Sequence, residues 1–131
     1  MEIEFSFREE HSKIFGPILR PVAKVIFKHA GIEVPQWVYV DSGADMTLIP
    51  KSMGDLLGFK INEDKITEVK GVGERVIPVV IKKAKIQIGE KEIEIHLAWS
   101  LVEEVPMLLG RKDLLDHFEI LLKNDKTIFR Y

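Results

Sequence analysis

Polar and apolar residues alternate along much of this sequence, and that alternation restricts the fold more than any other feature. The pattern is clear over residues 3–7, 22–27 and 85–97. Strands that are buried on one face have this period, because successive side chains point to opposite faces of a sheet. In the longest segment, Gly89 and Glu90 interrupt the alternation and are typical of a hairpin turn. The sequence therefore predicts a mainly β fold.

The remaining predicted elements are short. Residues 118–122 and 127–131 are predicted to be strands on either side of a Lys-Asn-Asp-Lys turn. Two short helices are expected, one over residues 51–57, ended by Gly58, and one over residues 112–117. No linker, repeat or low-complexity segment divides the sequence, so residues 1–131 are expected to form one domain.

Composition argues against several classes of function. The chain has 46% hydrophobic and 31% charged residues, as globular proteins do, and no apolar run approaches the roughly 18 residues that a membrane helix needs. The first residues lack the basic and apolar regions of a secretory signal, so a cytoplasmic location is expected. A formal net charge of −2 gives no electrostatic case for binding nucleic acid.

The sequence also gives no support for metal, thiol or cofactor chemistry. The absence of cysteine excludes disulfides, thiolate nucleophiles and cysteine-based metal sites. The histidines are scattered without the spacing of a helical metal site. Ser42 is a poor nucleophile candidate, because Val40 stands where a nucleophile elbow needs glycine. We therefore expect no metal and no cofactor.

The segment Gly71-Val72-Gly73 has two readings. A nucleotide-binding glycine loop would need a third glycine and a following helix, but Pro78 lies where that helix would run. The tip of a hairpin is the better interpretation, because glycine permits positive φ and the flanking residues 66–70 and 75–81 are predicted strands.

One carboxylate needs a chemical explanation. The segment VYVDSGADMTLIP, residues 38–50, places Asp41 at the end of an apolar strand, where a charge is costly unless it is paired, hydrogen-bonded or used. The order apolar-apolar-Asp-Ser-Gly-Ala resembles the active-site motif of aspartic proteases, and Asp45 makes it most similar to the retropepsin branch. Two further features resemble retropepsins in the same order: the glycine-bearing hairpin, at the place of the flap, and VPMLLGRKDLLDHF at residues 105–118.

This resemblance covers residues 20–131, so residues 1–19 are expected to be an amino-terminal extension. It implies a retropepsin-like closed β-barrel, the half-lobe of an acid protease, with one or two short helices. It implies a homodimer that cleaves a peptide or protein substrate. The implied catalytic residues are Asp41, Ser42 and Gly43, and the implied substrate-binding residues are Ala44, Asp45, Gly71, Val72 and Gly73. An ion pair of Asp45 with Arg111 is implied behind the active site, with Arg20 of the second subunit as a candidate third member.

The chemistry of such a protease needs two carboxylates that share one proton, because like charges in contact cannot both ionise. Asp45 is too far from Asp41 to be the second acid, since four residues of extended chain span about 13 Å. The apolar approach and the Ser-Gly sequel are also missing at Asp64, Asp113, Asp116 and Asp125. The second carboxylate is therefore expected to be Asp41 of a second copy of the chain.

Two other functions fit the same residues. A non-catalytic peptide-binding or assembly module could keep this fold, and Asp41 could merely cap a turn in a monomeric β domain. The intact Asp-Ser-Gly favours the enzyme, because a binding module has no use for a costly carboxylate pair. Three departures from the family pattern stand out: Ser42 replaces the commoner threonine, the loop between Val25 and Val38 is long, and an extra amino-terminal strand could cover an edge or block the usual dimer packing.

Overall fold

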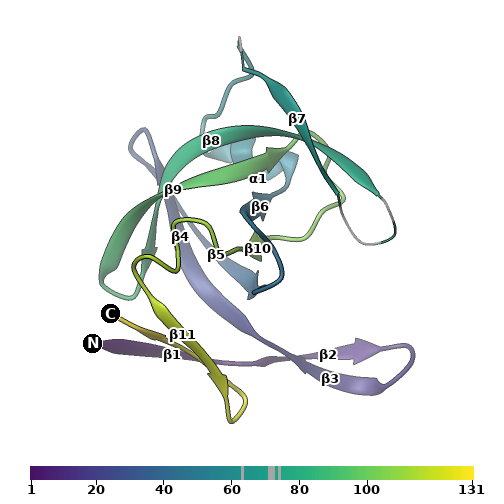
Figure 1. The fold of residues 1–131 in the computed structure, drawn as a ribbon, viewed down its shortest axis with the longest axis vertical. Coiled ribbons are helices and arrows are strands. Elements are labelled where there is room, and N and C mark those ends of the chain that lie inside the picture. The colour runs from purple at the N-terminus through teal and green to yellow at the C-terminus, as the bar shows by residue number, and fades with distance from the viewer. Residues whose placement is uncertain (63, 71–72, 74) are drawn as a thin grey trace.

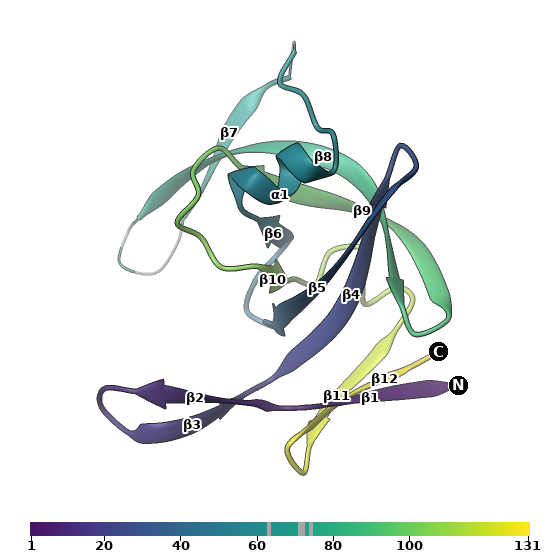
Figure 2. The same cartoon turned by 180° about the vertical axis from the view of Figure 1, so that it is seen from behind.

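The computed structural model describes residues 1–62, 64–70, 73 and 75–131. Figures 1 and 2 show a mainly β molecule with one short helix, α1 (Lys51–Leu56), among these residues. No helix in the described part of the chain is long and apolar enough to cross a membrane. The strands are β1 (Glu2–Ser6), β2 (Arg8–Ser12), β3 (Gly16–Arg20), β4 (Val22–His29), β5 (Ile32–Val40), β6 (Thr47–Ile49), β7 (Ile66–Lys70), β8 (Val76–Ile88), β9 (Lys91–Ser100), β10 (Leu108–Leu109), β11 (Glu119–Lys123) and β12 (Lys126–Arg130).

Six of these strands close into a barrel. They follow the order β4, β5, β10, β6, β9 and β8, and pairing between β4 and β8 completes the ring. At the closure, Phe27 of β4 lies opposite Ile86 of β8. β7 pairs antiparallel with the first part of β8, outside the ring. The predicted fold class is therefore confirmed.

The long hairpin of β8 and β9 supplies much of the core. Its inward residues are buried as the alternation predicts, among them Ile86, Ile88, Ile93, Ile95 and Leu97. Each fully buried isoleucine or leucine stabilises the fold by about 1.5–3 kcal/mol relative to an exposed one. The hairpin turns at Gly89, whose φ of 61° suits glycine. A smaller cluster consists of Leu48, Ile77, Val79 and Ala98.

The segment between Val25 and Val38 is not a long loop. β4 and β5 continue through it as a regular antiparallel hairpin, with His29 opposite Ile32 at its end. The turn needs only Ala30 and Gly31, whose φ values of 49° and 83° are both positive, as in the tight turns that match strand twist. The additional residues therefore lengthen two strands, and the expectation of a long loop is wrong.

Of the two predicted helices, the first is present and the second is not. α1 buries Met53 and Gly54, and the chain leaves it through Gly58 at a φ of 80°. Residues 112–117 instead form successive turns, in which the N–H groups of Leu114 and His117 donate to carbonyls three residues earlier. Asp113 has a φ of 65°, which a right-handed helix cannot contain, and this interrupts the helical pattern.

Both ends of the chain lie outside the barrel. β12 lies between β1 and β11, with Glu2 and Glu119 both opposite Arg130. The turn between β11 and β12 has positive φ at Asn124 and Asp125, as expected for the Lys-Asn-Asp-Lys sequence. β2 and β3 form a separate sheet of two strands, which projects away from the barrel in Figures 1 and 2.

Candidate active site

Asp41 follows directly on β5. Val38 and Val40 of this strand are buried, and Leu109 of β10 lies parallel and opposite to Val40. The Asp41 N–H donates to the Leu109 carbonyl oxygen at 3.1 Å. Buried parallel strands thus fix the Asp41 backbone, while its side chain remains partly accessible.

A strand from a distant part of the chain lies between two consecutive strands beside Asp41. β10 lies between β5 and β6, parallel to the first and antiparallel to the second, although β5 and β6 are consecutive along the chain. The Gly110 N–H donates to Oγ1 of the buried Thr47 at 3.2 Å. A Cβ atom at Gly110 would lie 2.4 Å from the Met46 carbonyl group, so only glycine fits at this crossing. Sequence reasoning did not single out Met46 or Thr47.

The Asp-Ser-Gly-Ala segment is a compact turn. The Gly43 N–H donates to Oδ1 of Asp41 at 2.9 Å, and the Ala44 N–H donates to the Asp41 carbonyl oxygen at 3.1 Å. The first bond orients the carboxylate, and the second folds the chain back, so the extended geometry assumed for this segment is wrong. Ser42 and Gly43 are both exposed. Ala44 is half-buried.

Arg111 contacts this turn through both backbone and side chain. Its N–H donates to the Ala44 carbonyl oxygen at 3.0 Å, and its guanidinium Nη2 donates to Oδ1 of Asp45. The side chains of Asp45 and Arg111 are 86% and 48% exposed in the single chain, so water screens their attraction. The Asp45 carboxylate is therefore engaged with a cation and not with Asp41.

Arg111→Ala is expected to lower the free energy of unfolding of the single chain by less than about 1 kcal/mol, because exposed ion pairs contribute little. Urea unfolding of this variant and of Arg111→Lys, at protein concentrations where chains do not associate, measures the effect. A loss of about 3 kcal/mol or more would contradict the exposed geometry, because such a loss is typical of a buried pair.

Arg20 contacts Glu10 rather than Asp45 of its own chain. Its Nε lies 3.0 Å from Oε1 of Glu10, and the Tyr39 hydroxyl donates to Oε2 of Glu10 at 2.6 Å. This hydrogen bond to a carboxylate raises the pKa of Tyr39 above its ordinary value. Sequence reasoning missed Glu10 and Tyr39. Tyr39 is two residues before Asp41, which was a usable signal, whereas nothing local marks Glu10.

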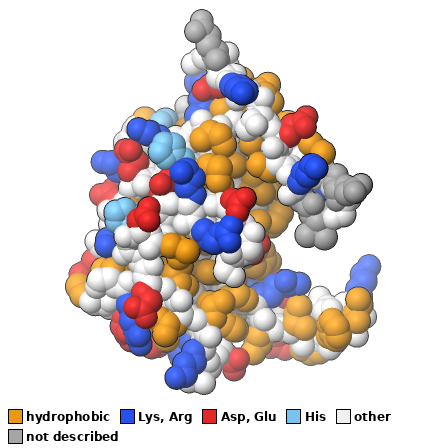
Figure 3. All heavy atoms as spheres, in the orientation of Figure 1, with side chains coloured by type: hydrophobic (Ala, Val, Ile, Leu, Met, Phe, Trp, Pro, Cys, Tyr) orange, Lys and Arg blue, Asp and Glu red, His pale blue; other side chains and the backbone are white. Residues whose placement is uncertain are grey.

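A pocket of about 470 Å³ connects these residues with Asp41. It lies where β3, β5 and β10 approach one another, and it is lined by Glu10, Arg20, Pro21, Tyr39, Val40, Asp41, Pro106 and Leu108. Figure 3 shows a hollow in the same region, between the projecting β2–β3 hairpin and the β7–β8 hairpin, with hydrophobic side chains along its wall. Asp41 is thus accessible from a cavity.

The turns after Arg111 are held to the barrel by Asp113. Its Oδ2 accepts a hydrogen bond from the His96 N–H at 2.8 Å and lies 3.0 Å from the His96 ring Nδ1. The His96 N–H, which favours the ionised carboxylate, holds the pKa of Asp113 below its ordinary value. The Asp113 carboxylate is therefore engaged with β9 and not with Asp41.

The predicted hairpin tip is only partly described. Gly71 and Val72 lie outside the described residues. Gly73 is exposed between β7 and β8, has a φ of 75°, and has open space where a side chain would be. Its positive φ agrees with a turn that suits glycine.

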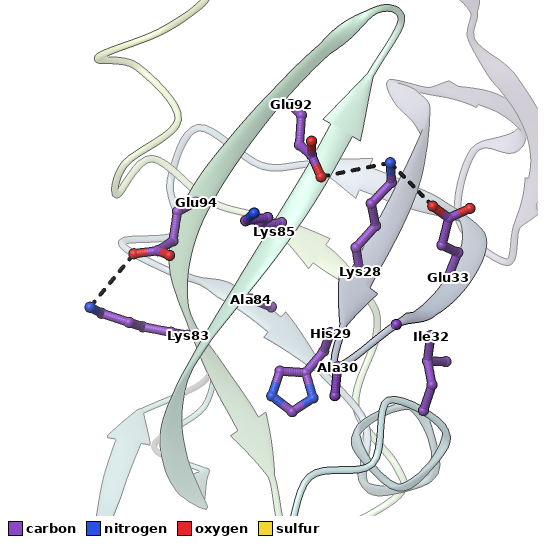
Figure 4. A pocket seen from close by; sticks show the side chains of 11 residues that line it. Lys28, His29, Ala30, Ile32, Glu33, Lys83, Ala84, Lys85, Glu92 and Glu94 are labelled. Atoms are coloured by element: carbon purple, nitrogen blue, oxygen red, sulfur yellow. Dashed lines mark ion pairs between the residues drawn. The ribbon is translucent and has the colours of Figure 1, made fainter.

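A second pocket, of about 390 Å³, lies at the β4–β5 turn and shares no residue with the pocket beside Asp41. Figure 4 shows ion pairs among its three Lys and three Glu side chains, with Lys28 3.3 Å from Glu33 and Lys83 3.6 Å from Glu94. This balance leaves little net charge for a ligand. Among the described residues, no group of three or more His, Asp or Glu side chains could hold a metal ion.

The closed barrel and the crossed strands define the fold, and the Asp-Ser-Gly turn lies where these strands meet. The sequence matches the aspartyl protease family over residues 25–112. Since this match spans more than half of the chain, the protein belongs to the aspartyl protease family. A comparison with curated protein sequences gives no match.

Solved structures identify the branch of the fold. A retropepsin-like aspartic protease from Rickettsia conorii matches with a TM-score of 0.65 and 20% identity, over 100% of this chain and 91% of that chain. The EIAV protease in complex with the inhibitor HBY-793 matches with a TM-score of 0.57 and 21% identity, over 74% of this chain and 86% of that chain. The fold is therefore retropepsin-like, as its sequence motifs predicted.

Proposed function

We propose that this protein is an aspartic endopeptidase whose active site combines the Asp41 carboxylates of two copies of the chain. The observation that carries the proposal is the environment of Asp41. Its N–H donates a hydrogen bond to the Leu109 carbonyl oxygen, and its carboxylate accepts a hydrogen bond from the Gly43 N–H. Asp41 also lines an accessible pocket. A carboxylate that merely capped a turn would not need a pocket beside it.

Among the described residues, the single chain offers no second free carboxylate beside Asp41. Asp45 is engaged with Arg111, and Glu10, the other acid of the pocket, has one oxygen beside Arg20 and the other bonded to Tyr39. Neither is free to share a proton with Asp41. A two-fold dimer supplies an identical Asp41 directly, and it makes the two carboxylates equivalent.

The proposed reaction uses a water molecule between the two carboxylates. The ionised Asp41 takes a proton from the water, whose oxygen attacks the peptide carbonyl carbon, and the protonated Asp41 donates to the carbonyl oxygen. The C–N bond of the resulting gem-diol then breaks: the pair gives its proton to the leaving amine nitrogen and takes one from a hydroxyl of the intermediate, which becomes the carboxylic acid, so the pair again holds one proton. The Gly43 N–H holds one carboxylate in place. Ser42 would hydrogen-bond across the pair, and Ala44 would leave room for the substrate.

The residues around the pocket favour an extended peptide as substrate. Leu108 lines the pocket and also packs against the smaller apolar cluster, which extends from β6 to the β7–β8 hairpin. Partly buried hydrophobic side chains pack against this cluster: Val69, Val102, Val105 and Leu108. The β7–β8 hairpin would act as a flap over the peptide, and apolar side chains of the substrate would pack beneath it.

A dilution series tests the two-chain site. Activity per chain is expected to fall on dilution in step with the fraction of dimer, because a single chain has one Asp41. Sedimentation over the same concentrations as a peptide-cleavage assay measures both quantities. A protein that is monomeric at every concentration and still cleaves peptide would contradict the shared site.

Gly73→Val is expected to lower kcat/KM by roughly tenfold or more, since a stiffened tip would not close over substrate. The fold should lose only about 1–2 kcal/mol from the positive φ, because an exposed tip buries little. Gly31→Val is the matched control, since Gly31 also has positive φ and open space but lies at the β4–β5 turn. Equal losses of activity in the two variants would show that the hairpin has no special part in turnover.

A further inference from the structure

The β2–β3 hairpin, here called the arm (residues 8–20), receives little packing support from the rest of the fold. It is a sheet of two strands, and no residue in it is buried. Isolated two-stranded hairpins are marginally stable in water, so most hairpins in proteins pack on something else. Figure 3 shows the arm as a separate projection across the hollow from the β7–β8 hairpin.

The end of the arm presents apolar side chains to solvent. Leu19, near the root of the arm, is 49% exposed, whereas Ile14 and Phe15, in the turn at its end, are 83% and 78% exposed. The turn that carries them is ordered by Ser12, whose hydroxyl oxygen accepts hydrogen bonds from the Ile14 and Phe15 N–H groups at 3.3 and 3.2 Å. An ordered turn with adjacent exposed Ile and Phe side chains is typical of a contact surface.

The root of the arm is attached to the active site. Glu10 of β2 bonds to Tyr39 of β5 and pairs with Arg20 of β3, and all three line the pocket that contains Asp41. The arm therefore begins beside Asp41 and extends outward from it. A second copy that brings its own Asp41 to this point must lie next to the arm.

In the sheet formed by the two ends of the chain, the central strand β12 has no free edge. β12 has β1 on one edge and β11 on the other, and the terminal amino group of Met1 donates to the Tyr131 carbonyl oxygen. Both termini are thus fixed in one sheet. Among the described strands beside Asp41, those of the arm have one neighbour each.

We propose that the arm is a clasp that holds a second copy of this chain, packing Ile14 and Phe15 against the partner on the far side of the shared cleft. The proposal rests on the two-chain active site proposed above, and it names the surface that assembles it. In a two-fold dimer each arm contact occurs twice, so two side chains per arm remove four apolar groups from water. At its root, Glu10 and Arg20 line the pocket beside Asp41, whereas Ile14 and Phe15 do not.

The double variant Ile14→Ser with Phe15→Ser tests the clasp. We expect the dimer dissociation constant, from sedimentation equilibrium, to rise at least about tenfold, because each lost contact is lost twice. The melting temperature of the dissociated chain and the turnover per dimer should not change, since both side chains are exposed in the single chain. The control is Ile32→Ser with Leu122→Ser, which removes exposed apolar side chains outside the arm and should leave dissociation unchanged.

Photo-cross-linking identifies the molecule that contacts the end of the arm. The chain has no cysteine, so Phe15→Cys and Leu122→Cys each introduce one thiol for a benzophenone maleimide. Irradiation of the labelled protein should give covalent dimers from Phe15→Cys and none from Leu122→Cys. Cross-links from Phe15→Cys to an added protein substrate instead of a second chain would overturn the clasp.

The outcomes separate this inference from the proposed function. An unchanged dissociation constant in the arm variant, with a dimeric wild type that needs two Asp41 residues, would overturn the clasp alone. An arm variant that weakens the dimer while Asp41→Asn retains full turnover would support the clasp and overturn the proposed chemistry. A wild type that is monomeric at all concentrations would overturn both.

Discussion

Asp41→Asn is expected to abolish peptide cleavage, with kcat/KM falling at least about a thousandfold, because general acid and base catalysis contribute factors of this order. Asparagine has the same shape and can still accept the Gly43 N–H, which lies 2.9 Å from Oδ1 in the wild type. It cannot take a proton from water or share one with its partner. Melting temperature and self-association should therefore remain at their wild-type values.

Mixing experiments show whether one chain can act alone. When equal amounts of wild-type and Asp41→Asn chains are mixed and allowed to exchange, about one quarter of the dimers should carry two Asp41 residues, and only these should cleave peptide. Activity that followed the total of wild-type chains would contradict the shared site. Asp125→Asn is a suitable control, since Asp125 lies in an exposed turn with a positive φ that asparagine tolerates.

The same variants decide between an enzyme and a binding module. A peptidase loses turnover in Asp41→Asn and keeps peptide binding, which fluorescence anisotropy of a labelled peptide measures. A wild type that binds the peptide in this assay but never cleaves it, at any pH or concentration, would favour the peptide-binding module. Wild-type turnover in Asp41→Asn would show that another group performs the chemistry.

Gly110→Ala is expected to cost about 2–3 kcal/mol of unfolding free energy or more, and to remove activity, because overpacking at a rigid contact is destabilising. The added Cβ would meet the Met46 carbonyl carbon and oxygen at 2.4 Å. Met46 belongs to the loop between Asp41 and β6, so relief of the clash would displace the active-site turn. Urea unfolding and a peptide-cleavage assay measure the two effects.

Gly31→Ala is the matched control for this variant. A Cβ at Gly31 meets nothing within 4 Å, so alanine there costs only the penalty for a φ of 83°, which is about 1–2 kcal/mol for a left-handed residue. Activity should remain at the wild-type level in this control. Equal behaviour of the two variants would show that the crossing of Gly110 over Met46 does not constrain the site.

Structure that depends on neighbouring residues was predicted well from the sequence, whereas structure that depends on tertiary contacts was not. Alternation predicted β4, β9 and the end of β8, and the glycines predicted the Gly89 turn and the end of the first helix before Gly58. The prediction failed at residues 112–117, where the pattern is helical but Asp113 takes a φ of 65°. There Asp113 is bonded to the His96 N–H of β9, and this tertiary contact outweighs a weak local propensity.

By itself the sequence determined the β class, the family motif and the carboxylate on which the proposed chemistry depends, because residue type and short-range spacing carry these properties. Only the tertiary structure decided that β10 lies between β5 and β6, that Gly110 must pass Met46, and that Glu10 bonds to Tyr39 beside Asp41. These are contacts between segments far apart along the chain. Their geometry follows from barrel closure and strand pairing, which no local pattern of residues encodes.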